Sequence, residues 1–306
     1  MDRTFDAEVW ARVVAAVKAA ARAVGRVGRK CVYSDQLIVL MYLWCVWHDR
    51  PLCWAADRAH YNTLFRPRKL PSVSQFTRRV KTHGVQLILQ ETHDLLAGCF
   101  TPVCFIDGKP LTVSPVSRDP QAARGHISGG FAKGYKLHAM MTEDGRIPLW
   151  SVMPLNVAEQ SVALALCDAL PVMSQESLIL ADSNYDSAPL HKRVAATGAR
   201  LLTPLRGQMQ VKNDQHHPVT LRQMGVARRE LIQLWRDHED LAEHMMHHRV
   251  LVEGGLSALT SYGGGLGSLP AWTRRLGRVT RWVGGKIILY HARWHVRKVR
   301  CRAAAA

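Results

Sequence analysis

Two apolar runs of this sequence each lead into an aspartate, and these carboxylates are its first candidates for chemistry. Residues 101–106 precede Asp107, and residues 177–181 precede Asp182. If both runs are strands lying parallel beside each other, the two carboxylates meet at one sheet edge although 75 positions separate them. Close carboxylates repel unless a cation lies between them, and Mg²⁺ is the natural cation for oxygen ligands. The alternative is that each aspartate simply begins a turn.

A third acid could join them from a helix. Arg249 and Glu253 are four residues apart and precede Leu256 and Leu259, which continue a helical apolar spacing. A helix that carries Glu253 against the sheet edge would complete a cage of three carboxylates. Such a cage suits phosphodiester chemistry, in which one metal ion activates the nucleophile and a second stabilises the leaving oxygen.

The apolar periodicity predicts two domains. Residues 1–98 form a helical N-terminal domain, and residues 99–306 form a second domain with a basic C-terminal segment. We predict helices over 5–24 and 34–47 and a helix start over 71–79. In the second domain we predict strands over 101–106, 111–116, 135–142, 147–153, 177–181 and 200–204, and helices over 156–170 and 189–197, with two more between 220 and 262. The strand at 101–106 is expected to end in a turn at Asp107-Gly108. This α/β (α+β mixed) pattern is typical of a mixed sheet flanked by helices, not of a doubly wound fold.

The charge balance indicates a polyanionic partner. The chain has 41 Lys and Arg against 24 Asp and Glu, a net charge of +17, which favours nucleic acid first and an acidic membrane surface second. After Glu253 there is no further acid. The predicted DNA-binding residues of this stretch are Arg274, Arg275, Arg278 and Arg281, and the cluster over 66–81 adds Arg78 and Arg79. Trp272 and Trp282 could stack on bases or belong to the core of the last helix, and we assign them to the core.

Several classes of protein are excluded. The seven cysteines include no CxxC pair, which argues against a disulfide framework or a four-cysteine zinc site. The N-terminus lacks a secretory signal, and the most apolar run, over 37–47, is too short for a bilayer that needs about 20 residues. We therefore expect an intracellular protein without a membrane span. Neither a zinc-protease motif nor an ATP-binding loop is present, and the glycine run over 263–267 is typical of a linker.

Taken together, the order and spacing of these motifs resemble bacterial insertion-sequence transposases with a DDE catalytic domain of the ribonuclease-H-like fold. The resemblance covers about residues 70–300. The matching residues are Phe105-Ile106-Asp107-Gly108, the stretch from Leu180 to Ser187, Arg249-x-x-x-Glu253, the stretch from Pro71 to Arg79, and Gly134-Tyr135-Lys136-Leu137-His138.

The resemblance implies a function and a role for each residue. Asp107, Asp182 and Glu253 would be the catalytic residues and the ligands of Mg²⁺, with Mn²⁺ as a plausible substitute. Arg249 would orient Glu253 or contact a DNA phosphate, and Tyr185 would anchor the strand-to-helix turn. Lys109 and Lys136 would meet phosphate, although a solvated surface lysine is the simpler interpretation of either alone. The protein would bind the terminal inverted repeats of its element as a homodimer on double-stranded DNA, in the bacterial cytoplasm at the nucleoid, and would cleave and join strands there.

The last motif departs from the family pattern in four positions. Met246 and Thr260 replace a tyrosine and a lysine, and Gly254 and Gly255 follow the glutamate directly. Each glycine costs about 1 kcal/mol relative to alanine in a helix. Two alternatives therefore stay open beside an active transposase: a ribonuclease-H-like nuclease without strand transfer, and a catalytically dead relic that binds DNA.

Overall fold

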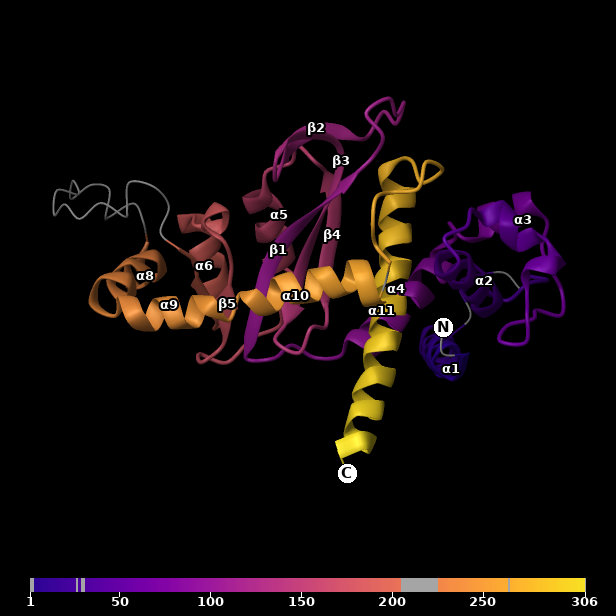
Figure 1. The fold of residues 1–306 in the computed structure, drawn as a ribbon, viewed down its shortest axis with the longest axis horizontal. Helices are drawn as coiled ribbons and strands as arrows, with labels where there is room; N and C mark the ends of the chain where they lie inside the picture. The colour runs from indigo at the N-terminus through magenta and orange to yellow at the C-terminus, as the bar shows by residue number, and fades with distance from the viewer. Residues whose placement is uncertain (1–2, 26, 29–30, 205–224, 264, 306) are drawn as a thin grey trace. The chain divides into compact units, whose positions relative to one another are not determined.

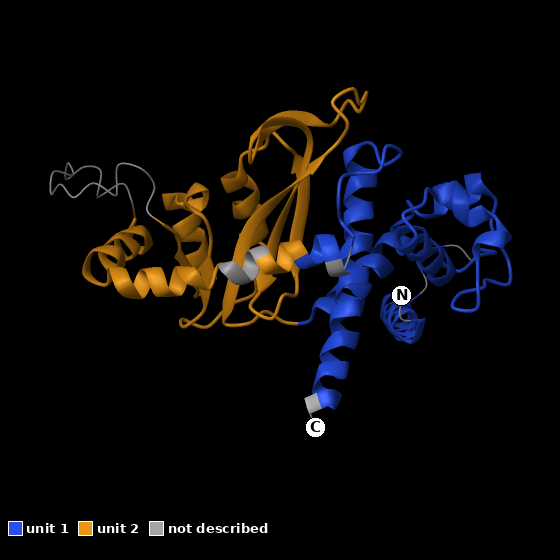
Figure 2. Ribbon diagram, viewed as in Figure 1, with its two compact units in different colours: residues 1–98, 258–306 blue, residues 99–257 orange. Residues whose placement is uncertain are grey.

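The computed structural model describes residues 3–25, 27–28, 31–204, 225–263 and 265–305, without the side chains of 250–253, 262–263 and 305. The chain divides into two compact units (Figure 2). Unit 1 contains Met1–Gly98 and Ala258–Ala306, and unit 2 contains Cys99–Ser257. Within the described part, no helix combines the length and the apolar composition that crossing a membrane requires.

Unit 1 is built from helices (Figure 1). They are α1 (Arg3–Val24), α2 (Asp35–Trp47), η1 (Leu52–Ala56), η2 (Arg58–His60), α3 (Val73–Arg79), α4 (His83–Ala97), η5 (Leu259–Gly263) and α11 (Leu276–Ala305). The predicted starts are confirmed at two helices. Ser34 caps α2 by accepting a hydrogen bond from the Leu37 N–H (3.2 Å), and Ser72 and Gln75 form a capping box at α3.

The C-terminal helix α11 packs in unit 1, which differs from the sequence-based division that kept 99–306 together. It contacts α1, α2 and α4. Val283 and Ile287 are fully buried there, and a Cβ on Gly285 would approach the Val46 Cγ2 to 2.9 Å. Helix α2 is apolar on nearly every face, so it needs cover from several helices, and α11 supplies part of it.

Unit 2 contains a mixed six-stranded sheet with the order β2-β3-β1-β5-β6, and β4 pairs with β3. The strands are β1 (Val103–Thr112), β2 (Ala123–Ile127), β3 (Gly130–Thr142), β4 (Leu149–Pro154), β5 (Leu178–Leu180) and β6 (Arg200–Leu202). The β1–β5 and β5–β6 pairs are parallel and the others are antiparallel. The predicted mixed sheet is confirmed, and the strands predicted over 135–142 and 147–153 are confirmed as β3 and β4, which pair with each other.

The predicted turn at Asp107-Gly108 is wrong. The strand β1 continues through both residues to Thr112, and Asp107 pairs with Ala139 and Gly108 with His138 of β3. The long antiparallel partner keeps β1 extended beyond the point where its parallel partner β5 ends at Leu180. The separate strand expected over 111–116 does not form, because residues 111 and 112 are the end of β1. The strand β2 was not predicted.

Unit 2 also contains helices, several of which pack against the sheet. They are α5 (Glu159–Cys167), η3 (Ser183–Tyr185), α6 (Ala188–Ala196), α8 (Val226–Asp237), α9 (Glu239–His247) and α10 (Val250–Ala258). On one face, Cys104 and Ile106 of β1 and Ile179 of β5 form a buried cluster with residues of α5 and α6. Because side chains alternate along a strand, Phe105 and Asp107 belong to the opposite face.

Candidate active site

The strand register of unit 2 brings Asp107 and Asp182 to equivalent positions. The last residue pair between β1 and β5 is Phe105 with Leu180, and each aspartate follows its member of that pair by two positions. Neighbouring strands lie about 4.8 Å apart, and residues two apart share a face. Both carboxylates therefore start from the same sheet face at the end of β5, as the sequence predicted for parallel neighbours.

The electrostatics of Asp107 confirm that charged groups gather around it. Burial raises the pKa of Asp107 above its ordinary value, and the charges of Asp182 and Glu159 add to the rise. The Gly108 N–H donates a hydrogen bond to Asp107 Oδ1 (2.7 Å). This hydrogen bond and the charge of Arg249 lower the pKa of Asp107 and so oppose the rise. A half-buried carboxyl whose like-charged neighbour disfavours ionisation is a candidate cation ligand.

Asp182 is held by the short helix η3 that follows it. Its Oδ1 accepts a hydrogen bond from the Asn184 N–H (2.8 Å), and its Oδ2 accepts one from Asn184 Nδ2 (3.3 Å). Tyr185 is fully buried in the core under α5 and α6. Burial and the charges of Glu159, Asp107 and Asp182 raise the pKa of its phenol, whose hydroxyl has no hydrogen-bond partner in the described structure. The tyrosine thus packs as the anchor of this turn.

Arg249 lies in the turn between α9 and α10, close enough for its charge to act on Asp107 and Tyr185. Glu253, the predicted third ligand, belongs to α10, but its side chain lies outside the described residues. Among the side chains that are described, no three His, Cys, Asp or Glu residues are grouped to hold a metal ion. The structure therefore brings together two of the three predicted ligands and Arg249.

Helix α10 packs on the sheet face that carries Asp107, and Gly255 makes the close approach possible. Met141 pairs with Phe105 in the sheet, so both belong to this face. A Cβ on Gly255 would lie 2.1 Å from Met141 Cε, whereas a Cβ on Gly254 would meet nothing within 4 Å. One of the two glycines that depart from the family pattern therefore has a packing reason.

The two predicted phosphate-binding lysines lie on opposite faces of the sheet. Lys109 shares its face with Asp107, is half-buried, and has its pKa lowered by that burial. Lys136 pairs with Pro110 in the register and therefore lies on the face covered by α5, where it forms an ion pair with Glu159. Gly108 packs against this pair, since a Cβ there would lie 3.0 Å from Lys136 Cδ. Sequence reasoning missed Glu159, although an acid beginning the helix after a hairpin was a visible signal.

A buried ion pair fixes the far end of the Asp182 turn. Asp186 ends η3 with a fully buried carboxylate, and Arg228 of α8 donates to both its oxygens, with Nε and Nη2 each at 2.8 Å. His191 Nε2 of α6 lies 3.3 Å from Asp186 Oδ1 without hydrogen-bonding geometry. Two-point contact with a carboxylate is the strongest geometry that arginine offers. Sequence reasoning missed this pair because 42 residues separate its members.

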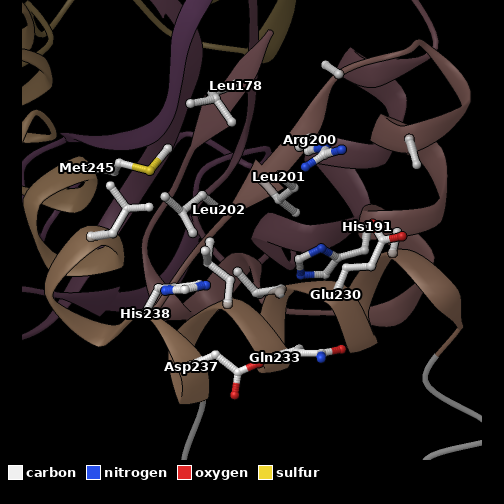
Figure 3. A pocket seen from close by; sticks show the side chains of 16 residues that line it. Leu178, His191, Arg200, Leu201, Leu202, Glu230, Gln233, Asp237, His238 and Met245 are labelled. Atoms are coloured by element: carbon white, nitrogen blue, oxygen red, sulfur yellow. The ribbon is translucent and has the colours of Figure 1, made fainter. Parts of the chain in front are cut away.

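A cavity of about 520 Å³ lies beside the edge strand β6 in unit 2 (Figure 3). His191 and Glu230 are neighbours on one side of it in this view, and Leu202 belongs to its apolar wall. None of the described residues that line it is Asp107, Asp182 or Arg249. The cavity is therefore separate from the carboxylate site.

The predicted DNA-binding arginines lie in unit 1. Arg78 is exposed at the end of α3, whereas Arg79 forms an ion pair with Asp35 at the start of α2. Arg274 and Arg275 are exposed before α11, and Arg274 Nε donates to the Ala271 carbonyl (2.9 Å). The other two predicted arginines lie in the first turns of α11. Arg278 is exposed and Arg281 is partly buried.

A mixed sheet with two aspartates at the end of a parallel strand pair is consistent with a ribonuclease-H-like domain. Residues 98–296 match the family model described as the transposase DDE domain. The chain belongs to this transposase family, and the predicted resemblance and fold class are confirmed. The matched region includes most of α11, so the family domain extends across both compact units. A search of curated protein sequences found no match.

Proposed function

We propose that this transposase cleaves and joins DNA strands at the site of Asp107 and Asp182, with Glu253 as the third carboxylate. The register that gives both aspartates the same position at the end of β5 is the observation that carries the proposal. Phosphodiester cleavage and strand transfer are both displacements at phosphorus, so one site can serve both. The proposal needs no covalent intermediate with the protein.

The donor set fits hard divalent cations, which the DDE transposase family generally uses. Carboxylate oxygens are the ligands that Mg²⁺ prefers, and Mn²⁺ accepts the same set. Bound divalent ions would activate a water or a 3′-hydroxyl and stabilise the charge that develops at phosphorus. A cation would also offset the burial, and the smaller repulsion by neighbouring carboxylates, that raise the pKa of Asp107.

The other residues of the site would bind and orient the strand. Arg249 offers a guanidinium beside Asp107, where it can contact a phosphate oxygen or hold Glu253. Lys109 shares the face of Asp107 and can meet the DNA backbone there. Lys136 already has a partner in Glu159, so its proposed contact with phosphate would require that ion pair to open.

The proposed substrate is double-stranded DNA, both at the terminal inverted repeats of the element and at its target. The arginines of α3 and of the start of α11 would supply phosphate contacts, and a homodimer would hold two ends together for joining. Binding should weaken steeply with salt, because each phosphate contact releases condensed counterions.

A nicking and joining assay tests the proposal. A supercoiled plasmid carrying both element ends is incubated with the full chain and Mg²⁺, and nicked, linear and joined products are resolved on a gel. We expect products with wild type, at least about 10³-fold fewer with Asp107→Asn or Asp182→Asn, and unchanged amounts with Asp168→Asn, a half-exposed acid in the same unit.

The two alternatives give different results in this assay. Nicks without joined product would favour a nuclease. Salt-sensitive binding of the same DNA without any Mg²⁺-dependent cleavage would favour the catalytically dead relic, which Met246 and Thr260 motivate.

A further inference from the structure

Unit 1 contains a small cavity between α2, the turn after it, α3 and the start of α11. Its volume is about 180 Å³. Its lining has a basic part and an aromatic part. The basic part contains Arg50, Lys81, Arg278 and Arg281, and the aromatic part contains Tyr42, Trp272 and Trp282.

The cations of the cavity have no counter-charge within it. None of the described residues that line it is acidic, and Asp49, which precedes Arg50, forms an ion pair with Lys286 (2.6 Å). Arg281 is partly buried and forms no ion pair in the described structure. Burial, and to a smaller extent the charge of Arg278, lowers the pKa of its guanidinium, against the opposing effect of Tyr42. Arginine nevertheless stays charged in proteins, so this cavity holds a desolvated positive charge without its anion.

Two buried rings and one partly exposed ring form the aromatic part of the lining. Trp282 and Tyr42 are buried, at 3% and 5% exposure, and Trp272 meets Trp282 edge-on with ring centroids 4.7 Å apart. Arg278 Nη1 donates to the Trp272 carbonyl (2.9 Å), which ties one cation to the aromatic wall. The assignment of these tryptophans to the core is compatible with this second role, because the same rings border the cavity.

We propose that this cavity binds one unpaired nucleotide of a DNA strand, with its base against the aromatic wall and its phosphodiester at Arg278 and Arg281. Rings and cations together suit a nucleotide better than a free anion, because bases stack on aromatic side chains while arginine contacts phosphate. A base paired within a duplex offers its face to neighbouring base pairs, so the cavity selects an unpaired one. The proposal rests on the proposed function in that it assumes DNA as the partner.

Binding of two fluorescein-labelled probes to the full chain tests the selectivity. One is a ten-residue oligothymidine and the other a blunt duplex of 20 base pairs, and anisotropy is measured over a range of salt concentrations. We expect Arg281→Gln to weaken binding of the single strand about 10- to 100-fold and to reduce its salt slope by about 0.7, with at most about threefold weaker binding of the duplex. Arg12→Gln, which removes an exposed cation of α1, should change binding of either probe by less than about threefold.

The aromatic wall is tested separately. Trp272→Ala should weaken binding of the single strand about 5- to 100-fold, and Trp272→Phe should restore most of it, because phenylalanine keeps a stacking surface. Thermal melts of each variant exclude a folding defect. An oligothymidine carrying one 5-iododeoxyuridine should photocrosslink to Tyr42, Trp272 or Trp282.

Equal weakening of both probes by Arg281→Gln would overturn the proposal and leave a simple phosphate contact, and so would crosslinks found only outside the cavity. The nicking assay separates this failure from that of the proposed function. Crosslinking in the cavity without any cleavage would contradict only the catalytic proposal, whereas cleavage without crosslinking there would contradict only this one.

Discussion

Replacement of Arg228 by methionine tests the buried ion pair behind the Asp182 turn. The methionine keeps much of the unbranched apolar stem but removes the guanidinium that contacts both oxygens of Asp186 at 2.8 Å. The Asp186 carboxylate has no exposed area, and the nearby His191 Nε2 is not aligned to hydrogen-bond with it. The variant therefore leaves this buried carboxylate without the guanidinium of Arg228.

The expected loss follows from that burial. Removing one member of a buried ion pair costs about 3–5 kcal/mol, because the remaining charge stays desolvated. The Arg228 side chain is 15% exposed, which places the expectation at the lower end, about 3 kcal/mol.

Urea unfolding followed by circular dichroism measures the loss. Arg193→Met is the matched control, since Arg193 of α6 also pairs with an aspartate, Asp168, but both side chains are about half exposed. Exposed pairs contribute about 1 kcal/mol at most, so the control should lose much less. The double variant Asp186→Leu/Arg228→Met should regain most of the stability lost by Arg228→Met, because no buried charge remains.

A loss for Arg228→Met no larger than that for Arg193→Met would refute the reasoning. Loss of stability without a change in catalysis would show that the pair serves folding alone. If it also positions Asp182, the Mg²⁺ concentration for half-maximal nicking should rise in Arg228→Met while it stays unchanged in Arg193→Met.

Three further predictions concern the packing, the pH dependence and the metal site of unit 2. Gly255→Ala should cost about 1–2 kcal/mol because Met141 must repack, whereas Gly254→Ala should stabilise by up to about 1 kcal/mol; urea unfolding compares them, and equal effects would contradict the packing of α10. Burial lowers the pKa of His138 to about 4 from 6.5, so stability is complete above pH 6.5 and should fall by up to about 3 kcal/mol towards pH 4. The substitution His138→Leu should flatten that slope, and an unchanged slope would assign it to other groups. Without metal, Asp107→Asn should have a higher melting temperature than wild type, because the substitution removes a charge that burial disfavours. Added Mg²⁺ should raise the melting temperature of wild type but not that of Asp107→Asn.

Local sequence patterns predicted the elements of this fold well. The helix start over 71–79, the two strands on either side of residues 143–146 and the helical spacing of α1 all depend on neighbours within a few positions. Capping, turn chemistry and periodicity are local effects, so the sequence contains them. The same logic made Asp107 and Asp182 visible, because each follows an apolar strand.

The failed predictions concern which strand a strand pairs with and which charged side chain a lysine pairs with. The turn expected at Asp107-Gly108 does not form, because pairing with β3 keeps β1 extended. Lys136 forms an ion pair with Glu159, because the alternation of side chains along β3 places Lys136 on the face covered by α5. Neither partner could be identified from the local pattern around these residues.

Residue patterns alone identified the family, most of the helices and strands, and the two aspartates that follow apolar strand segments. Long-range packing places α11 with the N-terminal helices, lets α10 approach Met141 at Gly255, and pairs Arg228 with Asp186 behind the Asp182 turn. The physical reason is that a helix or strand is specified mainly by nearby residues, whereas the cover of a buried face and the partner of a buried charge come from segments far away in the chain. The partner of Asp186 is 42 residues away, and no periodicity connects the two.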